Sequence, residues 1–516
     1  MTFRSKVTLL CALCILYIFV FTLPQLRSTQ SDFFSEENDN IVDFETSWRW
    51  HRETSLTPPP YSSPTINPEE QSELELGYIQ PDLETPPPSP SPSSATVPVP
   101  VPFRHDPDEK FITFFTHSGF QNQLIQVENG ILLAWYLNRT LVLPRALMGE
   151  AFGWSYFDKL HLEHMLRDPS AADPCSRLAD AITAWEIECP DRTRYTVMPF
   201  DDIFDLSWAK QHVRIILRDR SDFDWFESEF DIHRAGVPNR VNGSYVDGDI
   251  LFFKGETRYD WRIFDTPRKS HRLGKYAESL DIFQLRKRNE KLIHFSSLFG
   301  TGKLPIRRPE HYDFLRTLQR SITYRHPAVL NAAERIVELM GGAGDFIGLH
   351  VRSSDGWFVK ALPENVLSIV SQINREMESR QRPIIKNVSP PTLNECLQLS
   401  RTSNMSLIYL ATDARSPRTD PAFRPLWETY PCTFTMDDVL APDSPDWAEL
   451  DALVDSSSGS SLRRFFLPLV DASVASRGWN FIGSKGSTFS GYIYRLHDVF
   501  WSSAVSQTLS EEQPKA

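Results

Sequence analysis

The chain of 516 residues contains few cysteines and few glycines, and its net charge is not positive. Six cysteines in this length are too few for a disulfide scaffold. Lysine and arginine number 54 against 67 aspartate and glutamate, and the resulting net charge of −13 argues against a protein held to nucleic acid by its overall charge. Hydrophobic residues make up 41%, which allows a sizeable core and excludes wholesale disorder.

Several chemical motifs are also missing. No cysteine–histidine cluster has zinc spacing, no Gly-x-Ser-x-Gly elbow occurs, and no glycine loop ends as a Walker A motif does. Two Asp-x-Asp triplets, 222–224 and 247–249, have a form that can hold a divalent cation on a diphosphate. Asp247-Gly248 is also a favourable hairpin turn, and we prefer that interpretation. We therefore expect no metal site.

An apolar run stands near the start of the chain. Arg4 and Lys6 precede the uncharged stretch 7–23, which as a helix would span about 26 Å. This pattern predicts that residues 1–28 are a cytosolic tail and a signal-anchor helix. A cleaved signal peptide is the alternative, although its apolar region is usually shorter and no small-residue cleavage site follows. We expect a single-pass type II protein of the Golgi or endoplasmic reticulum membrane with a lumenal body.

Residues 29–110 have the composition of a disordered stem. Fourteen of the 38 prolines lie between Pro58 and Pro102, a polyproline-II composition that forms a semi-rigid spacer. The stem contains 16 acidic and 4 basic residues and so carries −12, which leaves the remainder from residue 111 onward near −4. The acidity of the chain therefore belongs mainly to the stem.

The body is predicted to be α/β because strands and helices alternate at both of its ends. Residues 111–116 have buried-strand composition, 121–137 repeat apolar residues at helical spacing, and 141–144 indicate a second strand. Such a unit favours parallel strands. The middle, 146–325, has weak periodicity. We expect an amino-terminal lobe at 111–325 that receives the acceptor, a nucleotide-binding lobe at 326–505 and a tail at 506–516. Further strands are predicted at 345–351, 406–413, 432–436 and 480–485, and helices at 329–340, 423–430 and 462–475.

Cysteines and glycosylation triplets fit an oxidising compartment. Cys11 and Cys14 lie in the apolar run, as filler or as palmitoylation sites. The other four cysteines allow three pairings, of which the local pairs are the simplest. These local pairs are Cys175–Cys189 and Cys396–Cys432. Asn-x-Ser/Thr triplets begin at Asn138, Asn242, Asn387 and Asn404.

Polar loops follow four of the predicted strands. Ligands of open parallel sheets bind at the carboxyl ends of the strands, so these loops form the candidate site. They cover residues 117–123, 350–356, 412–413 and 483–490. The last loop is small and rich in hydroxyls, and it leads into a helix. It could therefore cradle a phosphate on backbone N–H groups or serve simply as an N-cap.

Three charged or titratable side chains in these loops have more than one interpretation. Arg352 could bind phosphate as a fork or pair with Asp355. We prefer to interpret His350 as a packed, hydrogen-bonded histidine rather than a catalyst. Asp413 could accept hydrogen bonds from a ligand or cap the next element.

Together the loops resemble those of the GDP-fucose O-fucosyltransferase superfamily. The stretches that carry the resemblance are SGFQNQ, FIGLHVRSSDG, IYLATDA and VDASVASRGWNFIGSKGSTFSGYI, in the family's order. The resemblance implies a GT-B fold with two Rossmann-like lobes facing a cleft. It also implies inverting, metal-independent transfer of fucose from GDP-fucose, without a cofactor, to a hydroxyl of a protein or glycan acceptor. We expect no nucleic acid among the partners.

The resemblance also implies roles for individual residues. The implied catalytic residues are Arg352, gripping the diphosphate, and Asn122, facing the sugar and diphosphate across the cleft. Ser487 and Thr488 would support Arg352 with their hydroxyls and amides. The other implied donor-binding residues are Gly119, Phe120, His350, Asp413 and Phe489, with Phe489 at the nucleotide and with Asp413 and His350 at the guanosine.

The chain departs from the family pattern at three positions. Some relatives place a glutamate where this chain has Asn122, so no carboxylate base is assigned, and Glu128 on the same helix is expected to be structural. Ser353 and Leu124 stand where the family often has arginine. Two alternatives therefore stay open: a related transferase that uses another nucleotide sugar, and a non-catalytic lumenal binding protein on the same scaffold.

Overall fold

The computed structural model describes residues 108–241, 243–267, 272–354, 356–383, 391–455 and 458–511. The predicted anchor helix and most of the predicted stem lie outside these residues, as do Asn242, Asn387 and Asp355. Among the described residues, no helix combines the length and the apolar composition needed to cross a bilayer.

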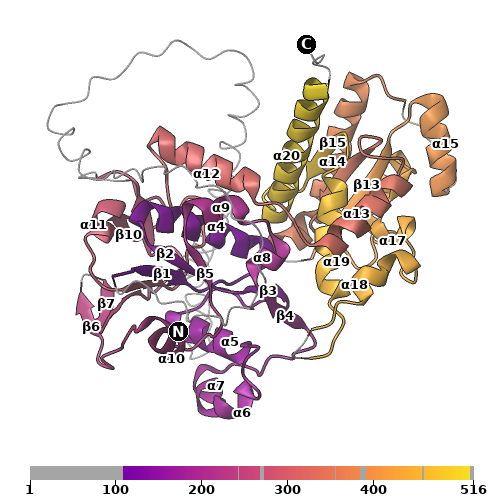
Figure 1. The fold of residues 1–516 in the computed structure, drawn as a ribbon. Helices are drawn as coiled ribbons and strands as arrows, with labels where there is room; N and C mark the ends of the chain where they lie inside the picture. The colour runs from indigo at the N-terminus through magenta and orange to yellow at the C-terminus, as the bar shows by residue number, and fades with distance from the viewer. Residues whose placement is uncertain are drawn as a thin grey trace, which may run out of the picture. The chain divides into compact units, whose positions relative to one another are not determined.

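A seven-stranded sheet organises the first lobe (Figure 1). Its strand order is β5-β2-β1-β11-β8-β7-β6; the first five strands run parallel, and β7 and β6 form an antiparallel edge. The predicted parallel strand–helix–strand unit is confirmed. The strands are β1 (Phe111–Phe114), β2 (Thr140–Leu143), β5 (Ile215–Leu217), β6 (Asn239–Val241), β7 (Ser244–Asp247), β8 (Ile250–Phe253) and β11 (Leu292–Phe295).

The central strands of this sheet are apolar on both faces because both faces are covered. Ile112 and Phe114 of β1 belong to a hydrophobic core with residues of α4 (Phe120–Leu137). Phe111, on the other face, joins a second core with residues of α5 and α10. The first-lobe helices are α4, α5 (Phe157–Leu166), α6 (Pro174–Arg177), α7 (Ala179–Trp185), α8 (Phe200–Ile203), α9 (Ser207–His212), α10 (Asp224–Phe230), α11 (Ile282–Arg286) and α12 (Pro309–Ser321).

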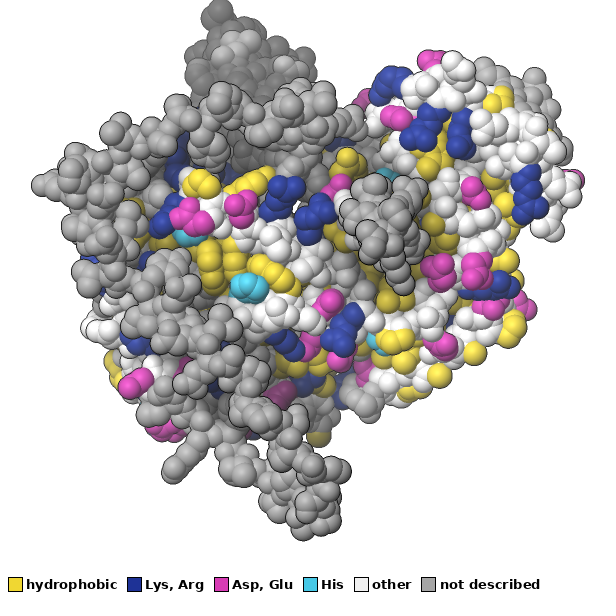
Figure 2. All heavy atoms as spheres, turned by 45° about the horizontal axis from the view of Figure 1, so that its top comes forward, with side chains coloured by type: hydrophobic (Ala, Val, Ile, Leu, Met, Phe, Trp, Pro, Cys, Tyr) yellow, Lys and Arg dark blue, Asp and Glu magenta, His cyan; other side chains and the backbone are white. Residues whose placement is uncertain are grey.

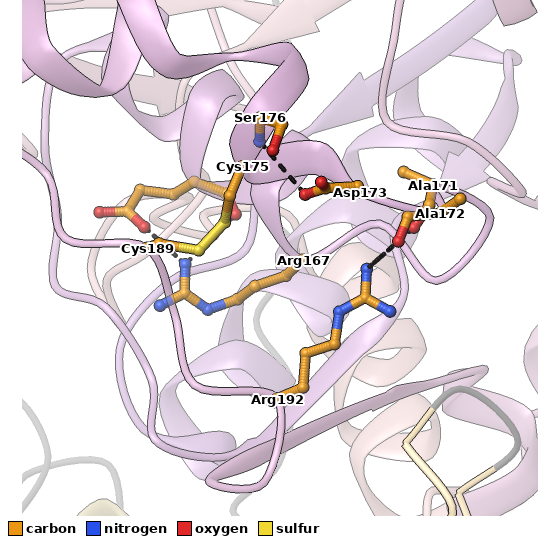
Figure 3. Close-up of a disulfide and its surroundings, with 9 residues drawn as sticks. Arg167, Ala171, Ala172, Asp173, Cys175, Ser176, Cys189 and Arg192 are labelled. Carbon is orange, nitrogen blue, oxygen red and sulfur yellow. Dashed lines mark hydrogen bonds and ion pairs between the residues drawn. A yellow bond between two sulfur atoms is a disulfide. The ribbon is translucent and has the colours of Figure 1, made fainter.

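The region with weak periodicity folds into short elements that depend on non-local contacts. The strands β3 (Ala146–Gly149) and β4 (Tyr195–Met198) pair antiparallel, and β9 (Trp261–Phe264) and β10 (Glu278–Asp281) pair parallel. The predicted disulfide Cys175–Cys189 is present and links the short helix α6 to the loop before β4 (Figure 3).

The second lobe is built on a four-stranded parallel sheet of order β14-β13-β12-β15. Its strands are β12 (Phe346–Val351), β13 (Leu407–Thr412), β14 (Thr433–Phe434) and β15 (Asn480–Gly483). All four lie within their predicted ranges, although β14 is shorter than expected. Its helices are α13 (Pro327–Leu339), α14 (Gly356–Ser379), α15 (Leu393–Ser403), η2 (Pro421–Phe423), α16 (Arg424–Thr429), α17 (Met436–Val439), η3 (Pro445–Trp447), α18 (Ala448–Asp451), α19 (Arg463–Ala475) and α20 (Thr488–Glu511).

Strand β12 is the centre of this lobe and is buried along its whole length. Ile347, Leu349 and Val351 pack with residues of α14 on one face of the sheet. On the other face Gly348 lets α19 approach, because a Cβ at this position would lie only 1.9 Å from the carbonyl oxygen of Ala475. The second predicted disulfide, Cys396–Cys432, is also present.

Neither Asp-x-Asp triplet forms a metal-binding cluster, and among the described residues no group of three histidine, cysteine or acidic side chains could hold a metal ion. Asp247 ends β7, and Gly248 turns the chain into β8 with a φ of +62°, as the hairpin interpretation predicts. Asp222 accepts a hydrogen bond from the Trp225 amide at the start of α10. Figure 2 shows acidic and basic side chains interspersed over one face of the described residues.

Helix α20 connects the second lobe to the first. Its Arg495 forms a buried ion pair with Glu128 of α4, with Nη2 2.6 Å from Oε1, and Asp498 pairs with Arg320 of α12 at 2.5 Å. The expectation that Glu128 is structural agrees with this pairing.

Candidate active site

Three of the four polar loops meet at the carboxyl edge of the second sheet. In the parallel register, His350 of β12 lies opposite Ala411 of β13 on one side and Gly483 of β15 on the other. The residues that follow these strands therefore leave the sheet at the same edge. This edge is where an open parallel sheet binds its ligands.

Arg352 and Asp413 form an ion pair at this edge. The Nε of Arg352 lies 3.3 Å from Oδ2 of Asp413, and both side chains are partly exposed. Asp413 also accepts hydrogen bonds from the amide and hydroxyl of Ser353, at 2.6 and 2.9 Å, and from the hydroxyl of Ser354. Burial alone would raise the pKa of Asp413, but the hydrogen bond from Ser354, the charge of Arg352 and the hydrogen bonds from Ser353 hold this pKa below its ordinary value.

Two contacts define the surroundings of Arg352 among the described residues. Asp413, 61 residues further along the chain, is an acidic partner of Arg352. Ser353 joins the β12 loop to Asp413. Asp413 therefore orients the arginine, and a guanidinium held in this way on a partly exposed edge can take a phosphate group as a fork.

Ser484 joins the third loop to the first two. Its hydroxyl accepts a hydrogen bond from the Arg352 amide at 3.0 Å, and its own amide donates to the His350 carbonyl at 2.9 Å. Ser484 is only 3% exposed. The sequence places Ser484 in the loop but gives it no role, because its hydrogen-bond partners follow or belong to a strand more than 130 residues earlier in the chain.

His350 is packed and hydrogen-bonded, as its preferred interpretation states. Its Nδ1 lies 2.6 Å from the hydroxyl of Ser490, and its ring meets that of Phe489 edge-to-face at 5.0 Å between centroids. Burial is the largest cause that lowers the pKa of His350 to about 4; the charge of Asp413 opposes the shift and that of Arg352 adds to it. The imidazole is therefore neutral at physiological pH, and the guanosine role that the resemblance implies stays a prediction.

The loop 483–490 caps the long helix α20. The Ser487 hydroxyl accepts a hydrogen bond from the Ser490 amide at 3.3 Å, and Gly486 adopts a φ of +78° just before it. Thr488 is the first residue of the helix. The N-cap interpretation is therefore correct, and it is compatible with an anion site because the first-turn amides of any long helix point outward along its axis.

The first loop lies at the carboxyl end of β1 in the other lobe. Gly119 precedes α4, and the ring of Phe120 stacks on Phe204 at 5.3 Å. Phe204 in turn meets Tyr492 of α20 edge-to-face at 5.9 Å, which connects this loop to the helix that begins at Thr488. The side-chain oxygen of Asn122 is buried, and no donor among the described residues reaches it.

The fold and this edge define an α/β protein of two parallel-sheet lobes with an arginine and a helix amino terminus at one ligand-binding edge. The model of the GDP-fucose protein O-fucosyltransferase family matches residues 185–500, and the chain belongs to this family. This confirms the superfamily that the four motifs indicate.

Individual proteins match the chain either over a small part of its length or at low sequence identity. The chain is 33% identical over 124 residues to O-fucosyltransferase 30 of Arabidopsis thaliana, a match that spans 23% of this chain and about a fifth (21%) of that protein. A crystal structure of POFUT1 in complex with GDP-fucose is 14% identical, with 76% of this chain and 95% of that chain covered and a TM-score of 0.32. The fucosyltransferase NodZ from Bradyrhizobium is 15% identical, with coverages of 75% and 91% and a TM-score of 0.33.

Proposed function

We propose that this chain transfers fucose from GDP-fucose to a hydroxyl group of a protein or glycan. The observation that carries the proposal is the meeting of Arg352, Asp413 and the amino end of α20 at one sheet edge in a member of the O-fucosyltransferase family. In the proposed site the donor GDP-fucose binds to the second lobe and the acceptor binds to the first, as the family resemblance of the four loops implies.

The proposed chemistry rests on neutralising the leaving group. When the bond between C1 of fucose and the β-phosphate oxygen breaks, GDP gains negative charge. Arg352, oriented by Asp413, and the amides at the amino end of α20 are suited to stabilise that charge. In this proposal the reaction needs neither a metal nor a cofactor, and the two lobes have the roles of the two halves of a GT-B enzyme.

The proposed location follows from the first hundred residues of the sequence. The basic flank and apolar run at 7–23 would anchor the chain in the Golgi or endoplasmic reticulum membrane as a type II protein, with the Pro-rich stem holding the body in the lumen. Asn138 and Asn404, the two described glycosylation candidates, are exposed C-caps of helices. Their exposure is compatible with this location.

A nucleotide panel tests the donor. Thermal unfolding of the protein is measured with GDP-, UDP- and CMP-sugars, and GDP release and fucose transfer are then measured with GDP-fucose. We expect GDP-fucose to raise the unfolding temperature and the other two nucleotide classes to leave it unchanged. Stabilisation by a UDP- or CMP-sugar in place of GDP-fucose would favour another donor, and GDP binding without any turnover would favour a binding protein.

Arg352→Ala tests the site. The ion pair with Asp413 is partly exposed and contributes at most about 1 kcal/mol to folding, so the variant should fold normally. Turnover should fall by about 10²- to 10³-fold, because a group that stabilises the leaving phosphate is lost. Arg335→Ala, which breaks partly exposed pairs with Glu338 and Asp446, is the control and should keep full activity. Equal activity of the Arg352→Ala variant and the parent would refute the assignment.

A further inference from the structure

A chain of hydrogen-bonded side chains runs from the first loop into the interior of the first lobe. The hydroxyl of Ser118 lies 2.8 Å from Nδ1 of His117, and Nε2 of His117 lies 2.7 Å from the hydroxyl of Ser297. Ser297 donates to Oε1 of Gln126 at 3.3 Å and accepts from the Phe299 amide at 3.0 Å. His117, Ser297 and Gln126 are at most 2% exposed, whereas Ser118 is only half-buried.

The hydrogen bonds around Gln126 determine which nitrogen of His117 carries the hydrogen. Nε2 of Gln126 donates to the carbonyls of His117 and Asn122, at 3.0 and 3.3 Å, so its oxygen faces Ser297. The single hydrogen of the Ser297 hydroxyl is used on that oxygen. Nε2 of His117 must therefore donate to Ser297, which leaves the lone pair on Nδ1 to accept the hydroxyl hydrogen of Ser118.

Ser118 is held in a backbone conformation that serine rarely adopts. Its φ is +67°, in the left-handed region, and such a residue costs about 1–3 kcal/mol. Two hydrogen bonds keep it there: its amide donates to the Phe152 carbonyl at 2.7 Å, and its carbonyl accepts from Gln123 at 3.0 Å. Glycine would adopt this conformation without strain. The serine therefore keeps its hydroxyl at this position against an energetic cost.

We propose that Ser118 and His117 form the pair that takes up the proton of the attacking hydroxyl. This inference rests on the proposed function, and it supplies the base that the amide of Asn122 cannot. The hydrogen of Ser118 points to His117, so the lone pairs of its oxygen are available to the acceptor. The attacking oxygen bonds to C1 of fucose as the C1–O bond to the β-phosphate breaks and its electron pair leaves with GDP. The acceptor proton passes to Ser118 as the Ser118 proton passes to Nδ1.

The pair acts as a relay and not as a store of the proton. Burial is the largest cause that lowers the pKa of His117 to about 3, and the charges of Arg258 and Lys303 act in the same direction. An imidazolium at this position is short-lived. The proton therefore returns through Ser118 to water after GDP has left, which restores the neutral pair for the next turnover.

Ser118→Gly tests the relay without straining the loop. The full chain is incubated with GDP-fucose alone, so that water is the acceptor, and GDP release is measured. We expect kcat to fall by about 10²-fold, with the KM for GDP-fucose unchanged, because the hydroxyl contacts the acceptor and not the donor. His117→Asn keeps a hydrogen-bond acceptor for Ser118 near the Nδ1 position but is not basic, and it should be equally slow.

The controls separate the relay from the proposed function and from folding. Gln381→Gly changes another left-handed residue, with a φ of +53°, in the second lobe, and it should keep the parent rate. A parent chain that neither binds GDP-fucose nor releases GDP overturns the proposed function and the relay together. An active parent with an equally active Ser118→Gly variant overturns the relay alone. A raised KM with normal kcat in that variant, or a parental rate in His117→Asn, also overturns it.

Discussion

Glu128 is the acidic residue of α4 that would first be considered as a catalytic base. Its buried ion pair with Arg495 instead predicts a role in stability. Glu128→Gln removes the negative charge and leaves Arg495 buried without its counter-ion, since the two side chains are only 5% and 12% exposed. Leaving one member of a buried pair uncompensated costs about 3–5 kcal/mol. We therefore expect the free energy of unfolding to fall by that amount, while kcat of the folded protein stays within about twofold of the parent.

Urea unfolding and steady-state GDP release on the same samples measure the two effects separately. Glu338→Gln, which weakens an exposed pair on α13, is the matched control and should cost less than about 1 kcal/mol. Replacing the pair with apolar side chains, Glu128→Leu with Arg495→Met, should recover most of the lost stability. A Glu128→Gln variant of parental stability that has lost its turnover would refute the reasoning and make Glu128 a catalytic residue.

Two further predictions concern stability. Burial lowers the pKa of His117 to about 3, that of His350 to about 4 and that of His294 well below its ordinary value, so the unfolded chain binds more protons than the folded one. The free energy of unfolding should therefore decline as the pH falls through 6.5 toward these values, by about 1 kcal/mol per histidine between pH 7 and 5.5. Urea titrations that give the same free energy of unfolding across this pH range would contradict this. Gly348→Ala should destabilise the second lobe by about 1–3 kcal/mol or prevent its folding, because the new methyl would meet the backbone of Ala475, whereas Gly153→Ala, with open space around it, should have the stability of the parent in thermal unfolding.

The sequence predicts the sheets where their strands carry the signal themselves. β1, β12, β13 and β15 are apolar runs followed by polar loops, and the structure places each within its predicted range. The middle of the first lobe could not be predicted, because elements such as β3 and β4 are four residues long and are stabilised by pairing with each other across 45 intervening residues. Local periodicity contains no information about such pairs.

The residues of the candidate site could be predicted from the sequence, whereas the hydrogen bonds between them could not. Arg352, Asp413 and His350 stand directly after or at the end of strands, where a ligand site is expected. Their hydrogen-bond partners are loop serines that no sequence motif distinguishes from other serines. Among them are Ser353, Ser484 and Ser490. A serine in a loop has many possible roles, and only the register of β12 with β13 and β15 determines which atoms these serines reach.

That register has a consequence for how the chain can diverge. The three loops at the ligand edge keep their relative positions because each follows a strand whose neighbours are set by backbone hydrogen bonds. The segments that connect the strands on the faces of the sheet can lengthen, shorten or change composition without moving Arg352 or Ser484. Relatives can therefore keep the same ligand edge after most of their remaining sequence has drifted apart, with identity concentrated in a few short islands.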